Sequence, residues 1–289
     1  MHKSTISLLK VFLLSFFITS MNAIEIYEAF DLKAKNNTGF REGNLIGGLT
    51  SAGWMSSWTI GDGTAKYVKD SLVFRGLESS GGSAKVIGER KENFIGKGSL
   101  LRQMSVPFTG TVYGSFRVLP AHFMEDSIFG LIFTLPNAAE FNPRNALFSI
   151  CPKRWGSSYG AVGVGKKVFK IQNGVPCEKN KKYLVLWKMT HLPEIGSSDG
   201  VTIAMWVLNE NQVEHFSENG FDERDLNLAA SGEDSSNVLQ IGRMNVKDSK
   251  YSLYKGVLLS PFTYNTTSVV FDEVRISTQS FAEAVGIDK

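Results

Sequence analysis

Short runs of β-branched and aromatic residues, separated by turn-forming residues, recur along most of the chain. Runs of this kind without any long helical period are typical of the strands of a β-sandwich. The run 202–207 is apolar at nearly every position, which predicts a central strand covered on both faces. The pattern predicts one domain with strands over residues 67–74, 83–87, 100–104, 111–119, 128–135, 146–151, 161–164, 168–171, 183–189, 201–208, 238–244 and 269–276.

Two long stretches, 29–57 and 210–236, do not continue the strand pattern. Connections of this length usually cover a sheet or form the rim of a binding site. Within the second stretch, residues 222–228 have the pattern of a short helix, and residues 280–285 predict another helix after the last strand.

The last predicted strand alternates along its length. A regular strand would place Phe271, Glu273 and Arg275 on one face. Asp272 and Glu273 are adjacent, so the same rule points their carboxylates to opposite faces, where they cannot flank one glycosidic bond. The other face would then be mainly apolar around a single carboxylate, with Val270, Asp272, Val274 and Ile276.

The phrase Phe271-Asp272-Glu273-Val274-Arg275-Ile276 resembles the closing strand of concanavalin A-like, LamG-type jelly rolls, especially those of secreted planctomycete-like and verrucomicrobial proteins. The resemblance implies an all-β, concanavalin A-like jelly-roll sandwich of two antiparallel sheets, as a single LamG-like domain over residues 24–289. Such jelly rolls include lectins, glycanases, lyases and adhesion modules, so the resemblance alone does not choose a function. Other phrases resemble the same group in the same order, at residues 27–31, 53–58, 71–77, 80–84, 113–116, 183–187 and 201–207.

Residues 1–23 have the pattern of a secretory signal peptide. Lys3 and Lys10 are basic, residues 8–18 form an apolar core, and Ala23 ends a plausible cleavage site, although Met21 is larger than the residue preferred there. The alternative is an uncleaved anchor, but the core is shorter than the roughly 20 residues that span a bilayer. We therefore expect a secreted or periplasmic protein with no membrane insertion after cleavage.

The charges of the chain nearly balance. There are 31 basic and 28 acidic residues, and removing Lys3 and Lys10 leaves 29 against 28, a net charge of +1. This balance gives no electrostatic reason to expect a nucleic-acid partner.

The sequence contains only two cysteines, Cys151 and Cys177, and neither has a metal-ligand spacing. In an oxidising compartment they predict a disulfide. The alternative is two unpaired buried thiols.

Catalytic patterns are scarce. The chain has no E-x-D-x-x-E strand of jelly-roll glycanases, no Gln-x-His pattern of lyases and no H-E-x-x-H helix. His122, His191 and His215 fall at strand ends or in loops, where a surface or structural role is expected. The sequence therefore favours a protein without catalytic activity. The alternative is a catalytic set assembled from distant loops.

Four tryptophans have a structural interpretation. Trp187 and Trp206 lie inside apolar strands and are expected in the core. Trp54 and Trp58 are expected to pack the N-terminal segment against the sheets.

The loop that follows Cys151 is polar and rich in glycine, and it offers aromatic rings beside hydrogen-bond donors. Sugar sites use aromatic rings that stack on pyranose faces, with polar groups on the hydroxyls. Trp155 and Tyr159 are therefore predicted to form a glycan-contacting platform, with Arg154 as a donor. The alternative is an ordinary exposed loop.

Sugar-binding sandwiches of this resemblance often hold a structural calcium ion. Asp31 and Asp272 are the candidate ligands if the two termini pair. The alternative for Asp272 is a carboxylate bonded to the backbone. No other cofactor is indicated.

Together these features predict a secreted, non-catalytic carbohydrate-binding or surface-interaction domain whose partner is a polysaccharide or glycan. One alternative is a divergent glycanase or lyase, which requires carboxylates or a Tyr/His pair on the concave sheet. Another is a structural or adhesive protein without a sugar site, whose concave face would be filled by loop residues.

Overall fold

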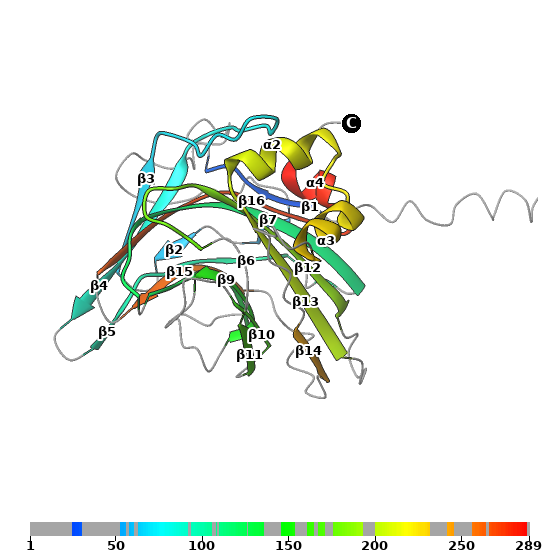
Figure 1. The fold of residues 1–289 in the computed structure, drawn as a ribbon. Helices are drawn as coiled ribbons and strands as arrows, with labels where there is room; N and C mark the ends of the chain where they lie inside the picture. Colours follow the sequence, from blue (N-terminus) through cyan, green and yellow to red (C-terminus); the bar gives the residue numbers. More distant parts are fainter. Residues whose placement is uncertain are drawn as a thin grey trace, which may run out of the picture.

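The chain folds into two curved, antiparallel β-layers packed face to face, with helices outside one of them (Figure 1). The predicted all-β jelly-roll sandwich of two antiparallel sheets is confirmed. The computed structural model describes residues 25–30, 53–55, 58–60, 63–91, 94–105, 108, 110–125, 127–135, 146–153, 161–164, 167–170, 176–192, 200–231, 242–245, 256–263 and 266–287.

The large sheet contains the longest strands. Its spatial order is β3 (Thr64–Val68), β4 (Ser83–Lys91), β16 (Thr267–Ser277), β7 (Gly110–His122), β12 (Tyr183–Leu192), β13 (Gly200–Leu208) and β14 (Gly242–Asn245). β1 (Glu25–Glu28) pairs with the second half of β16, with Glu25 opposite Ser277. The N-terminal and C-terminal strands of the described chain therefore meet in this sheet, as expected if the termini pair.

The small sheet lies beneath the large one. Its spatial order is β2 (Thr59–Ile60), β6 (Leu100–Gln103), β15 (Gly256–Thr263), β8 (Ile128–Thr134), β9 (Ala146–Lys153), β10 (Ala161–Val164) and β11 (Lys167–Lys170). β5 (Phe94–Lys97) pairs with both β15 and the end of β4, so it joins the two sheets at one edge.

The pattern of apolar residues did not predict β15, although this strand is central in the small sheet. Pro261 lies inside it and has no backbone N–H to donate to a ladder. On one side β15 pairs with β6 through Leu259 and with β5 from Phe262, so Pro261 falls where one partner replaces the other. The missing donor is thereby accommodated within a central strand.

The core between the sheets is dominated by aromatic and β-branched side chains. Trp187 on β12 is fully buried there, as predicted, and its ring meets Phe133 of the small sheet edge-on, with the centroids 5.4 Å apart. Gly114 lies opposite Trp187 in the sheet. A Cβ at Gly114 would lie 2.0 Å from Trp187 Cζ2, so the indole occupies the space that any larger residue would need.

The outer face of the large sheet is covered as well. Ala204, Trp206 and Leu208 of β13 alternate with inward-facing residues, which confirms a central strand covered on both faces. Phe281 of the helix α4 (Phe281–Val285) packs on Trp206 with the ring centroids 5.2 Å apart. The helix predicted at 280–285 is therefore present.

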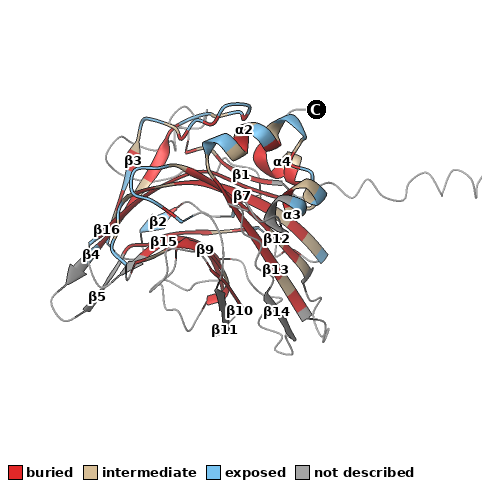
Figure 2. Cartoon of the chain, viewed as in Figure 1, coloured by how far each residue is buried: buried red, intermediate tan, exposed pale blue. Residues whose placement is uncertain are grey.

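Two further helices, α2 (Glu210–Glu218) and α3 (Glu223–Ser231), complete this cover. α3 confirms the helix predicted at 222–228, but α2 was not expected. It begins at Asn209, whose side chain accepts from the backbone of Gln212 in a capping box, and it buries Val213 and Phe216. Figure 2 shows the exposed sides of α2 and α3 facing outward. Among the described helices, none has the length and apolar character needed to cross a membrane.

The strand predicted at 67–74 ends at Val68. Residues 69–82, the cover loop, instead cross the outer face of the large sheet, with Phe74 and Leu77 in the apolar cluster beneath the helices. Gly76 in this loop has a φ of 82°, which favours glycine, and a Cβ there would lie 2.5 Å from Ser217 Oγ of α2.

Candidate functional site

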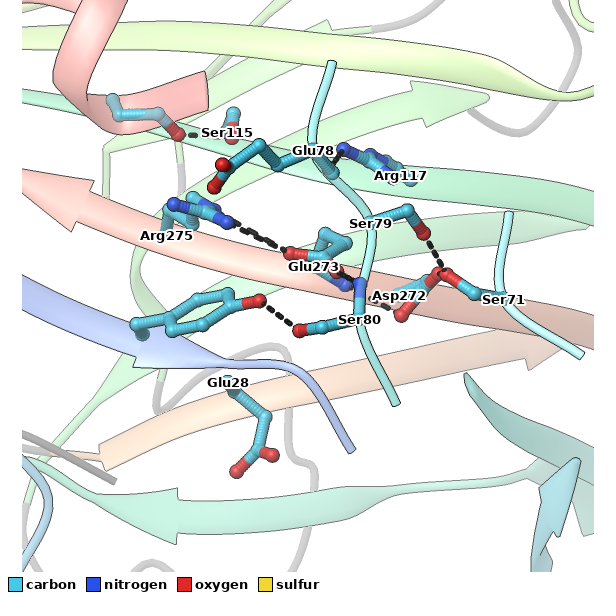
Figure 3. A network of polar contacts seen from close by, with 12 residues as sticks. Glu28, Ser71, Glu78, Ser79, Ser80, Ser115, Arg117, Asp272, Glu273 and Arg275 are labelled. Carbon is cyan, nitrogen blue, oxygen red and sulfur yellow. Dashed lines mark hydrogen bonds and ion pairs between the residues drawn. The ribbon is translucent and has the colours of Figure 1, made fainter. Parts of the chain in front are cut away.

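A buried polar cluster lies between the cover loop and the large sheet (Figure 3). The register of β16 against β7 shifts between Asp272 and Arg275, and Glu273 in this β-bulge has a φ of 48°. As a result, Asp272 and Glu273 both contact the cover loop, at Ser71 and Ser80. The prediction that these two carboxylates face opposite sides is wrong, because it assumed an unbroken alternation.

Both carboxylate oxygens of Asp272 accept hydrogen bonds. Oδ2 accepts from Ser71 Oγ at 2.6 Å and from the backbone N–H of Leu72 at 2.7 Å. Oδ1 accepts from the backbone N–H of Glu273 at 2.8 Å. Burial raises the pKa of Asp272 to about 7, against the lowering effect of the Ser71 and Leu72 hydrogen bonds and the charge of Arg117.

Glu273 joins the same loop to the N-terminal strand. Its Oε1 accepts from the backbone N–H of Ser80 at 2.8 Å, and its Oε2 lies 3.3 Å from Nη2 of Arg275. The Arg275 guanidinium lies 3.9 Å from the ring centroid of Tyr27 on β1. The Tyr27 hydroxyl bonds Ser80 Oγ at 2.7 Å, and burial raises the pKa of Tyr27 to about 12.

Arg117 completes the cluster from β7. Its guanidinium donates to the backbone oxygen of Leu72 at 3.0 Å and to that of Glu78. Burial lowers the pKa of Arg117, while the charges of Glu273 and Asp272 raise it. Because Asp272, Glu273 and Arg117 expose at most 1% of their surface, the cluster offers no surface to a substrate and serves to fasten the cover loop.

Asp272 was expected to be either a calcium ligand or a carboxylate bonded to the backbone. Its contacts match the second of these interpretations. Asp31 lies outside the described residues, so its proposed part in a calcium site stays a prediction. In the described part of the chain, no group of three or more His, Cys, Asp or Glu side chains is placed to hold a metal ion.

A second buried ion pair connects the two sheets. Arg102 on β6 pairs with Glu28 on β1, and its guanidinium lies 4.8 Å from the ring centroid of Trp54 and 5.7 Å from that of Trp58. Trp58 Nε1 donates to Glu28 Oε2 at 2.9 Å. Trp54 and Trp58 therefore pack the N-terminal strand against the small sheet, as predicted.

One end of the sandwich carries a more accessible group of side chains, the Phe123 cluster, formed by Phe123, Glu125, Lys153 and Lys179. Phe123 is half-buried and meets Phe129 edge-on, with the centroids 5.9 Å apart. The ammonium of Lys153 lies 5.9 Å from the Phe123 ring centroid, and that of Lys179 lies 6.0 Å from it. Lys153 is buried and donates to the backbone oxygen of Glu125 at 3.1 Å.

Two tight turns hold this cluster in place. The turn at 123–127 is closed by Ser127, whose Oγ accepts from the Met124 N–H at 3.0 Å and bonds Thr267 Oγ1 of β16 at 2.9 Å. In the turn at 176–182, the Tyr183 hydroxyl accepts from the N–H of Glu178 at 2.9 Å. Both turns are therefore tied to strands of the large sheet.

The predicted platform residues Arg154, Trp155 and Tyr159 lie outside the described residues. The strands on either side of them are described: β9 ends at Lys153, and Cys151 is paired with Ala161, the first residue of β10. The connection that carries the three residues therefore starts at Lys153 of the Phe123 cluster and ends at Ala161, opposite Cys151. Phe123 and Lys179 were not identified from the sequence, because they lie in turns far apart along the chain.

In Figure 1 the small sheet lies below the curved large sheet, and the lower face of the small sheet is the one turned away from the core. Four apolar residues on this face, Leu101, Ile132, Ala146 and Leu258, form a separate buried cluster. Because these side chains are buried, this part of the face is not an open sugar cleft.

Two of the three histidines have described side chains, and both have the surface or structural role expected from the sequence. His122 is exposed at the end of β7, and His215 on α2 packs edge-on against Phe216 with the ring centroids 5.1 Å apart. The side chain of His191 is not described.

The predicted disulfide is not formed in the structure, where Cys151 and Cys177 are both buried free thiols. The Cys177 thiol donates to the backbone oxygen of Pro152, the neighbour of Cys151, over 3.4 Å. Burial raises the pKa of Cys177 to about 12, against the lowering effect of the Lys153 charge. A thiol that keeps its proton can serve as this hydrogen-bond donor, in line with the alternative of two unpaired thiols.

The strand order and the covered outer face define a jelly-roll sandwich. No family model matches the chain, and no curated protein matches it. Among solved structures, this chain is similar to one from work on the endo-acting O-glycanases that prominent members of the human gut microbiota express to initiate mucin breakdown. The TM-score is 0.45 at 10% identity, covering 88% of this chain and 98% of that one.

Two other similar structures are the globular domain of T. cruzi calreticulin and the carbohydrate recognition domain of Emp47p. The first has a TM-score of 0.42 at 11% identity, covering 78% of this chain and 84% of that one. The second has a TM-score of 0.40 at 9% identity, covering 77% and 89%. Likenesses this distant do not carry an argument about function, and the LamG type stays a prediction.

Proposed function

We propose that this protein is a secreted, non-catalytic carbohydrate-binding or surface-interaction domain, and that it contacts its glycan through Trp155 and Tyr159, with Arg154 as a donor. The observation that carries this proposal is the position of the Phe123 cluster. The connection bearing the three residues begins at Lys153, whose ammonium lies over a half-buried aromatic ring.

A rigid base favours binding at a loop. Loops that carry binding residues are commonly positioned by a fixed scaffold, and side chains ordered before binding lose less entropy when the ligand arrives. Lys153 meets this requirement, because it belongs to β9 and donates to the turn at Glu125. The proposed platform would extend from this base.

The two adjacent carboxylates of β16 are unsuited to glycoside hydrolysis. A retaining glycosidase needs two carboxyl groups about 5 Å apart that face the sugar, and an inverting one needs them further apart with room for a water. Asp272 and Glu273 lie on one face but are sealed beneath the cover loop, with their oxygens accepting hydrogen bonds. They cannot flank a glycosidic bond while that loop is in place.

One observation favours a second candidate, a structural or adhesive protein without a sugar site. The buried cluster around Leu258 on the outer face of the small sheet agrees with a concave face that is filled. In that case the Phe123 cluster would be an ordinary surface feature, and no glycan would bind.

Replacing Trp155 by Ala separates the two candidates. Loss of one aromatic stacking contact, at about 1 kcal/mol, should weaken glycan binding roughly fivefold or more. Leu228→Ala removes an exposed apolar side chain on α3 and is the matched control, expected to bind as the unmodified protein does. Unchanged binding by Trp155→Ala would refute the platform, and absence of any glycan binding by the unmodified protein would favour the second candidate.

A further inference from the structure

The cover loop, residues 69–82, leaves the large sheet and returns to it at neighbouring positions. Val68, the last residue of β3, is paired with Ser83, the first residue of β4. The Ser83 hydroxyl also donates to the backbone oxygen of Asp70 at 2.7 Å, which closes the neck of the loop. A compact loop whose ends lie close together can move as a unit. The cover loop can therefore leave the face of the sheet without separating β3 from β4.

The loop is fastened to a carboxyl group that has no cation in direct contact. Asp272 is fully buried, and among the described residues its carboxyl group forms no ion pair. Arg117 lies opposite Asp272 in the ladder, but its Nη1 and Nη2 donate to backbone oxygens of the loop, at Leu72 and Glu78. Burying a carboxylate without a paired cation is costly, so this position favours the neutral carboxyl group.

The other charged groups around Asp272 do not provide that cation. Glu273, its neighbour on β16, carries a like charge and pairs with Arg275 at 3.3 Å. On β1, Tyr27 contacts the same Arg275 guanidinium with its ring. The charged side chains of the cover loop are all exposed: Lys69, Asp70, Arg75 and Glu78. An ionised Asp272 would therefore have the like charge of Glu273 as its neighbour along the strand, which disfavours ionisation further.

A neutral carboxyl group keeps every contact to the loop. Protonated at Oδ2, Asp272 would donate to Ser71 Oγ over the same 2.6 Å, and the Ser71 hydroxyl would then donate to Ser79 Oγ, which it already contacts. The N–H groups of Leu72 and Glu273 still find lone pairs on the two carboxyl oxygens. The closed loop thus satisfies the protonated side chain completely.

We propose that the cover loop is a pH-sensitive latch, which the protonated Asp272 holds on the large sheet and which opens locally when that proton is lost. The cause is linkage. Opening lets water reach Asp272 and returns its pKa from about 7 towards 3.8, so the closed loop holds the proton more tightly than the open one. The preference for the closed loop is fully present below pH 3.8 and is lost as the pH rises towards about 7. Release uncovers the outer face of the large sheet while the strands stay paired.

Hydrogen exchange followed by mass spectrometry on the purified protein tests the latch. The reporter amides are those of Leu72 and Ser80, which donate to Asp272 and Glu273. After correction for the intrinsic effect of pH, we expect residues 69–82 to exchange roughly tenfold or more faster at about pH 7 than at about pH 5. Amides of β12 should exchange more slowly than the loop at both pH values, which identifies the opening as local.

Two substitutions assign the titration to one side chain. Asp272→Asn should remove most of the pH dependence of loop exchange, because an amide does not titrate. Asp70→Asn removes an exposed carboxylate from the same loop and should keep the profile of the unmodified protein. Full pH dependence in a folded Asp272→Asn protein would assign the titration to another group and overturn the latch.

The unmodified protein decides the question even if Asp272→Asn does not fold. Equal corrected exchange of the loop at both pH values would refute the latch. Equal exchange rates for the loop and β12 would also refute it, because the loop would then open only when the whole sandwich unfolds.

Discussion

Replacing Asp272 by Asn tests how the buried polar cluster contributes to stability. The substitution keeps the shape of the side chain and removes its titration. Asp272 is fully buried and receives hydrogen bonds from the cover loop and from its own strand. The asparagine amide cannot accept all of these hydrogen bonds, and this loss lowers the stability by the same amount at every pH. The change of stability with pH therefore reports the titration of the carboxyl group.

The magnitude follows from the pKa. Burial raises the pKa of Asp272 from 3.8 to about 7. Since one pKa unit corresponds to about 1.4 kcal/mol, the difference between the folded and unfolded states is worth about 4 kcal/mol. The folded state holds the proton more tightly, so this stabilisation is fully present below pH 3.8 and is lost as the pH rises towards 7 and above.

The assay is urea unfolding followed by tryptophan fluorescence at several pH values between about 4 and about 8. The free energy of unfolding of the unmodified protein should fall by about 4 kcal/mol more over this range than that of Asp272→Asn. Asp70→Asn, at an exposed position of the same loop, is the control and should follow the unmodified protein.

Parallel pH profiles for Asp272→Asn and the unmodified protein would refute this reasoning. They would mean that the three hydrogen bonds and the Arg117 charge outweigh burial, and that Asp272 is ionised throughout the range.

Three other predictions concern the rest of the domain. Arg102→Met should lower the free energy of unfolding by about 3–5 kcal/mol, because it removes the guanidinium that pairs with the buried Glu28 carboxylate; urea unfolding measures this, and a loss near zero would contradict it. Gly114→Ala should cost about 1–3 kcal/mol, since its Cβ would collide with Trp187; an unchanged melting temperature would be the contrary result. EDTA should leave the melting temperature unchanged, because protein donors already occupy both oxygens of Asp272; a decrease reversed by calcium would show a bound ion.

The sandwich itself could be predicted from the sequence because its inner strands obey simple alternation. The runs around Trp187 and Trp206 are apolar at successive positions. Both faces of these strands therefore had to be covered. The alternation failed at Glu273, where a β-bulge turns two successive carboxylates to the same side. A bulge leaves no clear mark in the pattern of apolar and polar residues.

Pairing between distant residues was the other limit. Nothing near Arg102 in the sequence indicates that Glu28 will neutralise it, and nothing near Lys179 indicates that it will share the Phe123 ring with a strand residue. Helix α2 was missed for a different reason. Its capping box at Asn209 is readable from the sequence, but the polar segment that follows was interpreted as part of a long irregular connection.

The most direct test of the central claim is a glycan-array and polysaccharide pull-down screen with the purified protein, in which every bound polymer is then assayed for new reducing ends and unsaturated products. We predict binding to a glycan without any cleavage of it. Cleavage would contradict the non-catalytic role, and the absence of binding across the screen would contradict carbohydrate recognition altogether.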